Sequence, residues 1–270
     1  MNNISKLITE QLISNREALK KYYFSKNSIT DTKHFVLDNV LPEDLVLEIY
    51  KSFPSKARYH SRETFREKKL TFAKLDELEN NLPELITDAL QSNEIINEIE
   101  NITGINNLEG DPSLYAGGLS RMDKGHFLNP HIDNSHDANR LRYRRLNILF
   151  YISPNLNQED GGNFELWDSK VKTPLKIPSL FNRLVVMETT KTSWHSVDPV
   201  LNDINRCCVS NYYFSKSSPT GEDYYHVTSF LGRPDQLFWR TYGRVDNLLR
   251  NTIAKTLKIS RGKDLGKGVD

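Results

Sequence analysis

The most constraining feature of this 270-residue chain is a series of short β-rich runs between Leu114 and Phe214. Branched and aromatic residues dominate the runs, and Gly, Pro, Asn and Asp separate them, which is typical of strands joined by turns. The runs are LYAGGLSRM, FLNPHID, RLNILFYIS, NFELW, RLVVME and RCCVSNYYF. Strands this short and this closely spaced predict an antiparallel barrel or sandwich.

Helical patterns flank the β-rich region on both sides. The N-terminal segment carries an apolar stripe at helical spacing, and LPED at 41–44 has the proline and acids typical of a first helical turn. Apolar residues at three and four spacing continue from Leu75 to Ile102, where Pro83 is expected to divide two helices. A last helical pattern runs through Phe238, Tyr242, Val245, Leu249 and Ile253.

These patterns predict one integrated domain that is mainly β with helical additions. Residues 1–110 are expected to form N-terminal helices and a first strand that support the barrel, and residues 111–215 to form the β core. Residues 216–260 would add a loop and the last helix. Residues 261–270 have too little apolar content to pack, which predicts a disordered tail.

Composition narrows the classes of function. With 36 Lys and Arg against 35 Asp and Glu, the chain lacks the basic excess by which proteins coat nucleic acid. It has no apolar span of membrane length, and its N-terminus lacks the uninterrupted apolar core of a signal peptide. The two cysteines, Cys207 and Cys208, are adjacent, so a disulfide framework is implausible. We therefore expect a cytoplasmic protein that binds neither nucleic acid nor membrane.

Two histidines and one aspartate provide the strongest chemical signal. His131 and Asp133 are two positions apart, so in an extended backbone both side chains project to the same side. His195 follows a later β-rich run. Two imidazoles and one carboxylate form the facial triad that binds non-haem Fe(II) and leaves coordination positions open. A His-x-Asp pair alone is common by chance, and a hydrogen-bonded surface turn is its alternative.

Further residues, in chain order, strengthen the metal-site interpretation. Arg206 opens the run RCCVSNYYF, where its guanidinium can form a bidentate pair with the distal carboxylate of a bound diacid. Between the two histidines, Tyr151 closes the run LNILFYI, and Gly161-Gly162 marks a bend at which side chains would crowd. The ordered set is more specific than any of its parts.

With these residues in this order, the segment from about Phe35 to Phe214 resembles the iron(II)/2-oxoglutarate-dependent oxygenase superfamily, particularly its prolyl-4-hydroxylase-like branch. The resemblance implies a distorted double-stranded β-helix, the jelly-roll or cupin architecture. It also implies Fe(II), O2 and the cosubstrate 2-oxoglutarate, which is converted to succinate and CO2 while one oxygen atom enters the substrate. His131, Asp133 and His195 would be the iron ligands, and Arg206 would bind the distal carboxylate of 2-oxoglutarate.

The chain departs from the family pattern at two positions. Relatives often have a tyrosine nine positions before the first ligand, where this chain has Met122, which cannot donate a hydrogen bond. Many relatives also have a serine where this chain has Cys208. Other donors are therefore expected to contact the cosubstrate, with barrel-lining residues that only pack as the alternative. The candidates are Tyr115, Asn147, Tyr151 and Ser210.

A basic run, RLRYRR at 140–145, is the main indication of substrate chemistry. It follows the His-x-Asp pair closely, so an anionic substrate or acidic partner could be recognised at the barrel mouth. Its alternative is a solvated strand edge. The candidate substrate-binding residues are Arg121, Arg142, Arg144 and Trp167.

The leading hypothesis is a hydroxylase of a small metabolite, an amino acid or a peptidyl side chain, either free or carrier-linked. Asp133 favours hydroxylation over halogenation, because halogenating relatives have a small residue at this position. The alternatives are an oxygenase that desaturates or cyclises its substrate, and a non-catalytic barrel retained as a sensor or interaction module. The complete triad with Arg206 argues against the last alternative, and the oligomeric state stays open.

Overall fold

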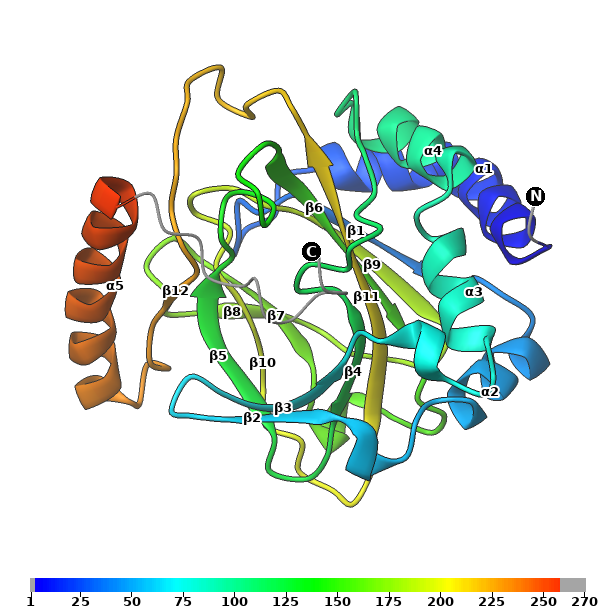
Figure 1. Cartoon of the computed structure of the whole chain (residues 1–270). Coiled ribbons are helices and arrows are strands. Elements are labelled where there is room, and N and C mark those ends of the chain that lie inside the picture. The colour runs from blue at the N-terminus through cyan, green and yellow to red at the C-terminus, as the bar shows by residue number, and fades with distance from the viewer. Residues whose placement is uncertain (1–2, 258–270) are drawn as a thin grey trace.

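The computed structural model describes residues 3–257, which form an antiparallel β core flanked by helices (Figure 1). The predicted disordered tail lies outside the described residues. The helices are α1 (Asn3–Phe24), α2 (Glu43–Lys51), α3 (Leu82–Ala89), α4 (Asn93–Thr103) and α5 (Leu237–Leu257). The strands are β1 (His34–Asp38), β2 (His60–Glu63), β3 (Glu67–Phe72), β4 (Gly118–Met122), β5 (Phe127–Ile132), β6 (Tyr143–Tyr151), β7 (Phe164–Trp167), β8 (Pro174–Ile177), β9 (Arg183–Glu188), β10 (His195–Val197), β11 (Arg206–Ser215) and β12 (Ser229–Phe230).

The strands form one curled antiparallel sheet. Its order is β1-β9-β6-β11-β4-β3-β5-β10-β7-β8, with β2 paired to β3 and β12 paired to β5. Figure 1 shows the strands curving around a central space, with α1 to α4 together on one side and α5 on the opposite side. The expected mainly β architecture, a distorted double-stranded β-helix with added helices, is thus confirmed.

Each of the six predicted β-rich runs contains a strand, and the structure adds shorter ones. Residues 1–110 hold three strands, β1, β2 and β3, where a single first strand was expected. Strands β2 and β3 were missed because their sequences, HSRE and EKKLTF, consist mainly of charged and polar residues. Only Leu70 and Phe72 of this hairpin are buried, and they alternate along β3 as expected for a strand with one face in the core.

The prediction that Pro83 divides two helices is wrong. Pro83 lies in the first turn of α3, and the interruption falls between α3 and α4. A proline is tolerated there because the first helical N–H groups have no partner within the helix. Helix α4 then ends at Gly104, whose φ of 71° is a left-handed conformation that glycine adopts without strain.

The main apolar core lies between the N-terminal helices and the outer face of the sheet. Ile8 and Leu12 of α1 are fully buried in one cluster with Ile99 of α4, Phe35 of β1 and Ile148 of β6. Burial of such side chains contributes roughly 1.5–3 kcal/mol each relative to exposure. These helices therefore support the sheet from outside, which leaves its inner face available for a site.

Helix α5 contacts the core differently from the other helices. Its predicted apolar stripe is exposed, with Phe238 72% and Leu249 57% accessible. Its polar side faces the protein, where the Asn247 amide receives a hydrogen bond from Phe230 N at 2.9 Å and donates one to Phe230 O at 2.8 Å. The helix is thus fixed to β12 by hydrogen bonds, and its Trp239 ring stacks on Phe65 with centroids 4.4 Å apart.

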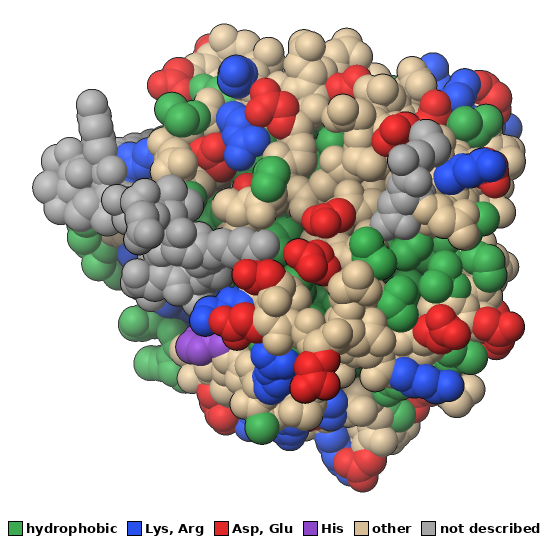
Figure 2. Space-filling view, turned by 45° about the vertical axis from the view of Figure 1, so that its right-hand side comes forward, with side chains coloured by type: hydrophobic (Ala, Val, Ile, Leu, Met, Phe, Trp, Pro, Cys, Tyr) green, Lys and Arg blue, Asp and Glu red, His purple; other side chains and the backbone are tan. Residues whose placement is uncertain are grey.

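The surface is mixed in charge, and none of the described helices is both long and apolar enough to cross a bilayer. On the face shown in Figure 2, lysine and arginine side chains are interspersed with aspartate and glutamate side chains. That distribution agrees with the nearly equal numbers of basic and acidic residues in the chain.

Candidate active site

Strand pairing brings the two candidate histidines together. β10 pairs antiparallel with β5, and His195 lies directly opposite His131. Their ring centroids are 4.0 Å apart. Asp133 follows the last residue of β5, so its carboxylate points to the same side as His131. Two segments that are distant in sequence thus contribute to one cluster.

The ligand atoms of His131, Asp133 and His195 all lie within 4.8 Å of one another. The Nε2 atom of His131 is 3.6 Å from Oδ1 of Asp133, and the Nε2 atom of His195 is 3.5 Å from Oδ2. All three side chains are largely buried, with exposed fractions of 7%, 13% and 5% in chain order. Within the described residues, this is the one cluster of its kind that could hold a metal ion.

The hydrogen bonds of both histidines fit a metal site. Nδ1 of His131 donates to Asn129 O at 3.1 Å, and Nδ1 of His195 donates to Ser193 O at 3.0 Å. A carbonyl oxygen only accepts, so each Nδ1 carries the proton and each Nε2 has a lone pair directed toward the cluster. Burial lowers the pKa of His131 and favours this neutral form. The donor set suits Fe(II) with open positions for further ligands.

Asp133 is held in its ionised form. Burial by itself would raise the pKa of its carboxyl, but the Arg144 guanidinium outweighs burial and holds that pKa well below its usual range. Oδ2 accepts a hydrogen bond from Asn147 Nδ2 at 2.8 Å and lies 3.3 Å from Arg144 Nη1. Two donors from β6 therefore fix the carboxylate in position.

A cavity of about 1020 Å³ opens beside the triad. The aromatic ring of Phe230 stacks on His131 with centroids 5.1 Å apart, and Phe164 lies 5.8 Å from His195. These rings cover the histidines from the side of β12 and β7. The volume exceeds that of a typical small-ligand site, so the cavity has room for two organic molecules side by side.

Arg206 also lines this cavity, at the first position of β11. Its buried guanidinium donates from Nε to Gly162 O at 2.6 Å and to Ser179 Oγ at 3.1 Å. The ring of Tyr151 lies 4.8 Å from the guanidinium carbon. Nη1 is 3.6 Å from the sulfur of Met122, a weak acceptor. The Nη edge is thus available to an anionic ligand, and Met122 occupies the place where a further donor was missing.

The structure separates the other predicted residues into two groups. Tyr115, Asn147, Ser210 and Arg144 line the cavity with the triad and Arg206. Tyr151 does not line it and contacts Arg206 from behind, where burial raises the pKa of its hydroxyl.

Three predicted substrate-binding residues have partners outside the cavity. Arg121 donates to Asp123 and Asn205 at 2.8 Å each. Arg142 donates to Asp137 at 2.8 Å and to Glu109 at 3.2 Å. Trp167 is buried and donates from Nε1 to Ser196 Oγ at 2.7 Å. The structure does not bring these three side chains to the cavity.

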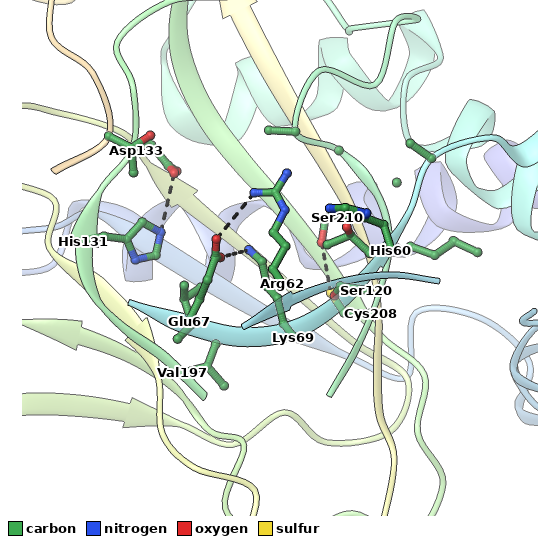
Figure 3. Close-up of a pocket in the computed structure, with 18 of the residues that line it drawn as sticks. His60, Arg62, Glu67, Lys69, Ser120, His131, Asp133, Val197, Cys208 and Ser210 are labelled. Carbon is green, nitrogen blue, oxygen red and sulfur yellow. Dashed lines mark hydrogen bonds and ion pairs between the residues drawn. The ribbon is translucent and has the colours of Figure 1, made fainter. Parts of the chain in front are cut away.

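Sequence reasoning missed the cavity wall that the β2–β3 hairpin forms beside the triad. Figure 3 shows Arg62, Glu67 and Lys69 of the β2–β3 hairpin near His131. The Glu67 carboxylate is 3.5 Å from Arg62 Nη1 and 3.0 Å from Lys69 Nζ. Burial would raise the pKa of Glu67, but the two cations lower it. The one available signal was the alternation of Leu70 and Phe72 with polar residues along this strand.

The comparisons with known proteins agree with this geometry. Residues 117–214 match a family model described as the 2OG-Fe(II) oxygenase superfamily. The matched segment contains the triad and Arg206. The matched segment, with the triad and Arg206, is thus similar to this superfamily, for which Fe(II), 2-oxoglutarate and O2 are the implied cofactors.

Solved structures share the fold at low sequence identity. A prolyl 4-hydroxylase from Phytophthora capsici is 18% identical, with a TM-score of 0.54, over 96% of this chain and 79% of that chain. A prolyl-4-hydroxylase from Pseudomonas putida is 14% identical, with a TM-score of 0.52, over 73% of this chain and 98% of that chain. These similarities concern the fold. A comparison with curated proteins finds no significant match.

Proposed function

We propose that this chain is an Fe(II)- and 2-oxoglutarate-dependent dioxygenase that hydroxylates an unactivated C–H bond of a small metabolite, an amino acid or a peptidyl side chain. The observation that carries the proposal is the convergence of His131, Asp133 and His195 within 4.8 Å, beside a cavity that also contains Arg206. Fe(II) held by the three side chains would supply the activation of O2, with 2-oxoglutarate as the co-reductant.

The surrounding residues of the chain would orient the three metal ligands. His131 and His195 would coordinate the ion through Nε2, because each Nδ1 donates to a carbonyl oxygen. Asn147 and Arg144 orient the Asp133 carboxylate. These contacts preorganise the ligands, so little conformational entropy is lost when the ion binds.

Arg206 would bind the distal carboxylate of 2-oxoglutarate. Gly162 and Ser179 occupy its Nε atom, so the guanidinium is fixed while its Nη edge can pair with a carboxylate in the bidentate manner that arginine favours. The neighbouring Tyr151 ring contributes a cation–π contact. A rigid cation with this geometry selects a dicarboxylate over a monocarboxylate.

We also propose that the reaction takes place in the cytoplasm. Cys207 and Cys208 are both free and buried, which agrees with a reducing compartment.

The test is 2-oxoglutarate turnover in the presence of Fe(II), measured as succinate against a panel of metabolites, amino acids and peptides. His131→Ala and His195→Ala should abolish turnover. His126→Ala is the matched control, because His126 is a buried histidine outside the triad. Full activity in either triad variant would overturn the ligand assignment, and a product that has lost two hydrogens without gaining oxygen would replace hydroxylation by desaturation.

A further inference from the structure

Arg144 is a buried cation whose hydrogen-bonding capacity is mostly unused. Its side chain is 1% exposed, and its Nη1 atom lies 3.3 Å from Oδ2 of Asp133. Its Nε and Nη2 atoms have no hydrogen-bond partner, although the residue lines the cavity beside the triad. Buried donors are almost always paired in native proteins, so two unpaired guanidinium nitrogens in a cavity indicate a ligand.

Neighbouring side chains hold the Arg144 guanidinium in place: the Tyr212 side chain accepts a hydrogen bond from it, while Nε and Nη2 stay unpaired. The ring of Tyr212 lies 4.0 Å from the guanidinium carbon and the ring of Phe214 lies 5.7 Å from it. Aromatic faces stabilise the cation and fix its plane while the N–H groups at its edge stay available. This arrangement differs from that of Arg142, whose guanidinium is paired with carboxylates outside the cavity.

The charges around the triad indicate the charge of the ligand that would fit beside Arg144. A bound ferrous ion would contribute two positive charges, and the buried Arg144 and Arg206 contribute one each. Asp133 and the dianion 2-oxoglutarate would together balance three of these four charges, which would leave one positive charge unmatched among these groups. Buried charge is costly unless it is paired. A monoanionic group on the second molecule in the cavity would complete the balance.

The wall of the cavity also carries an excess of positive charge. Eight of the lining side chains are lysine or arginine, and four are aspartate or glutamate. Near the triad, Arg62 and Lys69 share the single carboxylate of Glu67. A cavity lined by an excess of one charge raises the local concentration of ligands of opposite charge.

The positions of Arg144 and Arg206 assign them to different ligands. Arg144 lies over Tyr212, whereas Arg206 lies over Tyr151, which pairs with Cys208 four residues earlier on β11. Four residues of strand correspond to about 13 Å. The two guanidinium groups thus contact the cavity at separate levels, with Arg206 at one end and Arg144 beside the metal ligands.

We propose that Arg144 binds a carboxylate of the primary substrate next to the metal. This inference rests on the proposed function and narrows it. The substrate is a carboxylic acid, such as a free amino acid or another small acid, and the oxidised carbon lies within a few bonds of its carboxylate. An internal peptidyl residue without an acidic side chain does not provide this group. Because a guanidinium fork matches a planar carboxylate, the neutral amide of the same compound should bind much more weakly.

The binding test uses acetate as the probe and acetamide as its neutral analogue. Carbon-13 relaxation of each is measured with the protein loaded with Mn(II) and saturated with 2-oxoglutarate. With wild type, Mn(II) should enhance the carbon-13 relaxation rate of acetate and leave that of acetamide unchanged. Arg144→Gln should weaken acetate binding by at least about tenfold. Arg62→Gln, which removes one positive charge from the β2–β3 wall of the same cavity, should change it less than about threefold.

Four results would overturn the inference. Acetate binding that is unchanged in Arg144→Gln removes the assigned role, and equal losses in both variants replace a specific contact by a general electrostatic field. A loss of 2-oxoglutarate affinity in Arg144→Gln with acetate unaffected would assign the guanidinium to the cosubstrate. If Arg144→Gln does not fold, Arg144→Lys keeps the charge without the fork, and an acetate affinity equal to wild type contradicts the proposal.

The two proposals fail separately. If Mn(II) and 2-oxoglutarate do not bind, the metal assignment fails, while saturation-transfer measurements with acetate on the metal-free protein still compare wild type with Arg144→Gln. In turnover assays, a carboxylic acid substrate should show a raised KM in Arg144→Gln. With wild type, the KM of its amide should be much higher than that of the acid, and in Arg144→Gln the two KM values should become similar. An amide that wild type accepts as well as the acid would contradict the assignment.

Discussion

The contact between Gly162 and Arg206 makes a sharp prediction about 2-oxoglutarate binding. A Cβ atom at Gly162 would lie 2.9 Å from Arg206 Cδ and 3.2 Å from Val200 Cγ2. The Cδ atom adjoins Nε, which donates to Gly162 O at 2.6 Å and is held by Ser179 at 3.1 Å. Cδ is therefore fixed on both sides, and Gly162→Ala must displace the guanidinium.

The backbone effect of this substitution can be separated from the collision. Gly162 has a φ of +68° and Gly125 has a φ of +77°, but a Cβ at Gly125 would meet nothing within 4 Å. An alanine at either position costs about 1–2 kcal/mol for the left-handed backbone. Only Gly162→Ala also disturbs a hydrogen bond from a charged donor, which contributes about 1.5–3 kcal/mol. Gly125→Ala is thus the matched control.

The assay is calorimetric titration of 2-oxoglutarate into each variant loaded with Mn(II), with thermal unfolding as the check on folding. Both variants should lose similar stability from the backbone term. If about half of the hydrogen-bond energy is lost from the Arg206 site, Gly162→Ala should bind 2-oxoglutarate about tenfold more weakly than Gly125→Ala, since 1.4 kcal/mol is a factor of ten. Dissociation constants within twofold of each other would refute the argument that Gly162 positions Arg206.

Three further predictions concern stability. Burial lowers the pKa of His226 to about 4, so on acidification the unfolded chain takes up its proton first, near pH 6.5, and the free energy of unfolding should fall by up to about 3 kcal/mol between pH 7 and pH 4. His226→Gln should reduce that fall in urea titrations, and an unchanged pH slope would contradict the cause. Asn182 accepts from Leu41 N at 3.1 Å and donates to Leu41 O at 2.6 Å, so Asn182→Ala should cost about 2–3 kcal/mol in urea unfolding, and a cost below 0.5 kcal/mol would refute it. Tyr213→Phe removes a buried hydrogen bond to Leu90 O and should lower the unfolding free energy by about 1–2 kcal/mol, whereas an unchanged value would show that this bond contributes nothing.

The sequence predicted the ligands better than it predicted their surroundings. His131 and Asp133 share a side because strand alternation is local. The position of His195 depends on pairing between β10 and β5, and β10 has only three residues, too few for a propensity pattern. His195 was assigned to the same site as His131 and Asp133 from the family resemblance in residue order, because local sequence rules do not predict which distant strands pair. Register across distant segments follows from the packing of the whole sheet.

The basic run shows why alternation alone was insufficient. Asn147 and Tyr151 lie on the inner side of β6, so regular alternation would place Arg145 with them and Arg144 outside. The pairing of β6 with β11 is irregular here, because Tyr213 lies opposite Leu146 while Phe214 lies opposite Arg144. The extra residue reverses the alternation and turns Arg144 inward. No composition rule predicts the position of such a bulge.

Antiparallel pairing explains why the cavity has a cation at each end. β6 and β11 are neighbours that run in opposite directions, so the first residues of one strand lie beside the last residues of the other. Arg144 is near the start of β6 and Arg206 is at the start of β11, which places the two guanidinium groups at opposite ends of this strand pair. The triad on β5 and β10 lies beside Arg144, whose Nη1 atom is 3.3 Å from Asp133 Oδ2, and it lines the same cavity as Arg206. A dicarboxylate bound to Arg206 and a monocarboxylate bound to Arg144 would therefore approach the same three ligands from different directions, as a reaction between two bound molecules requires.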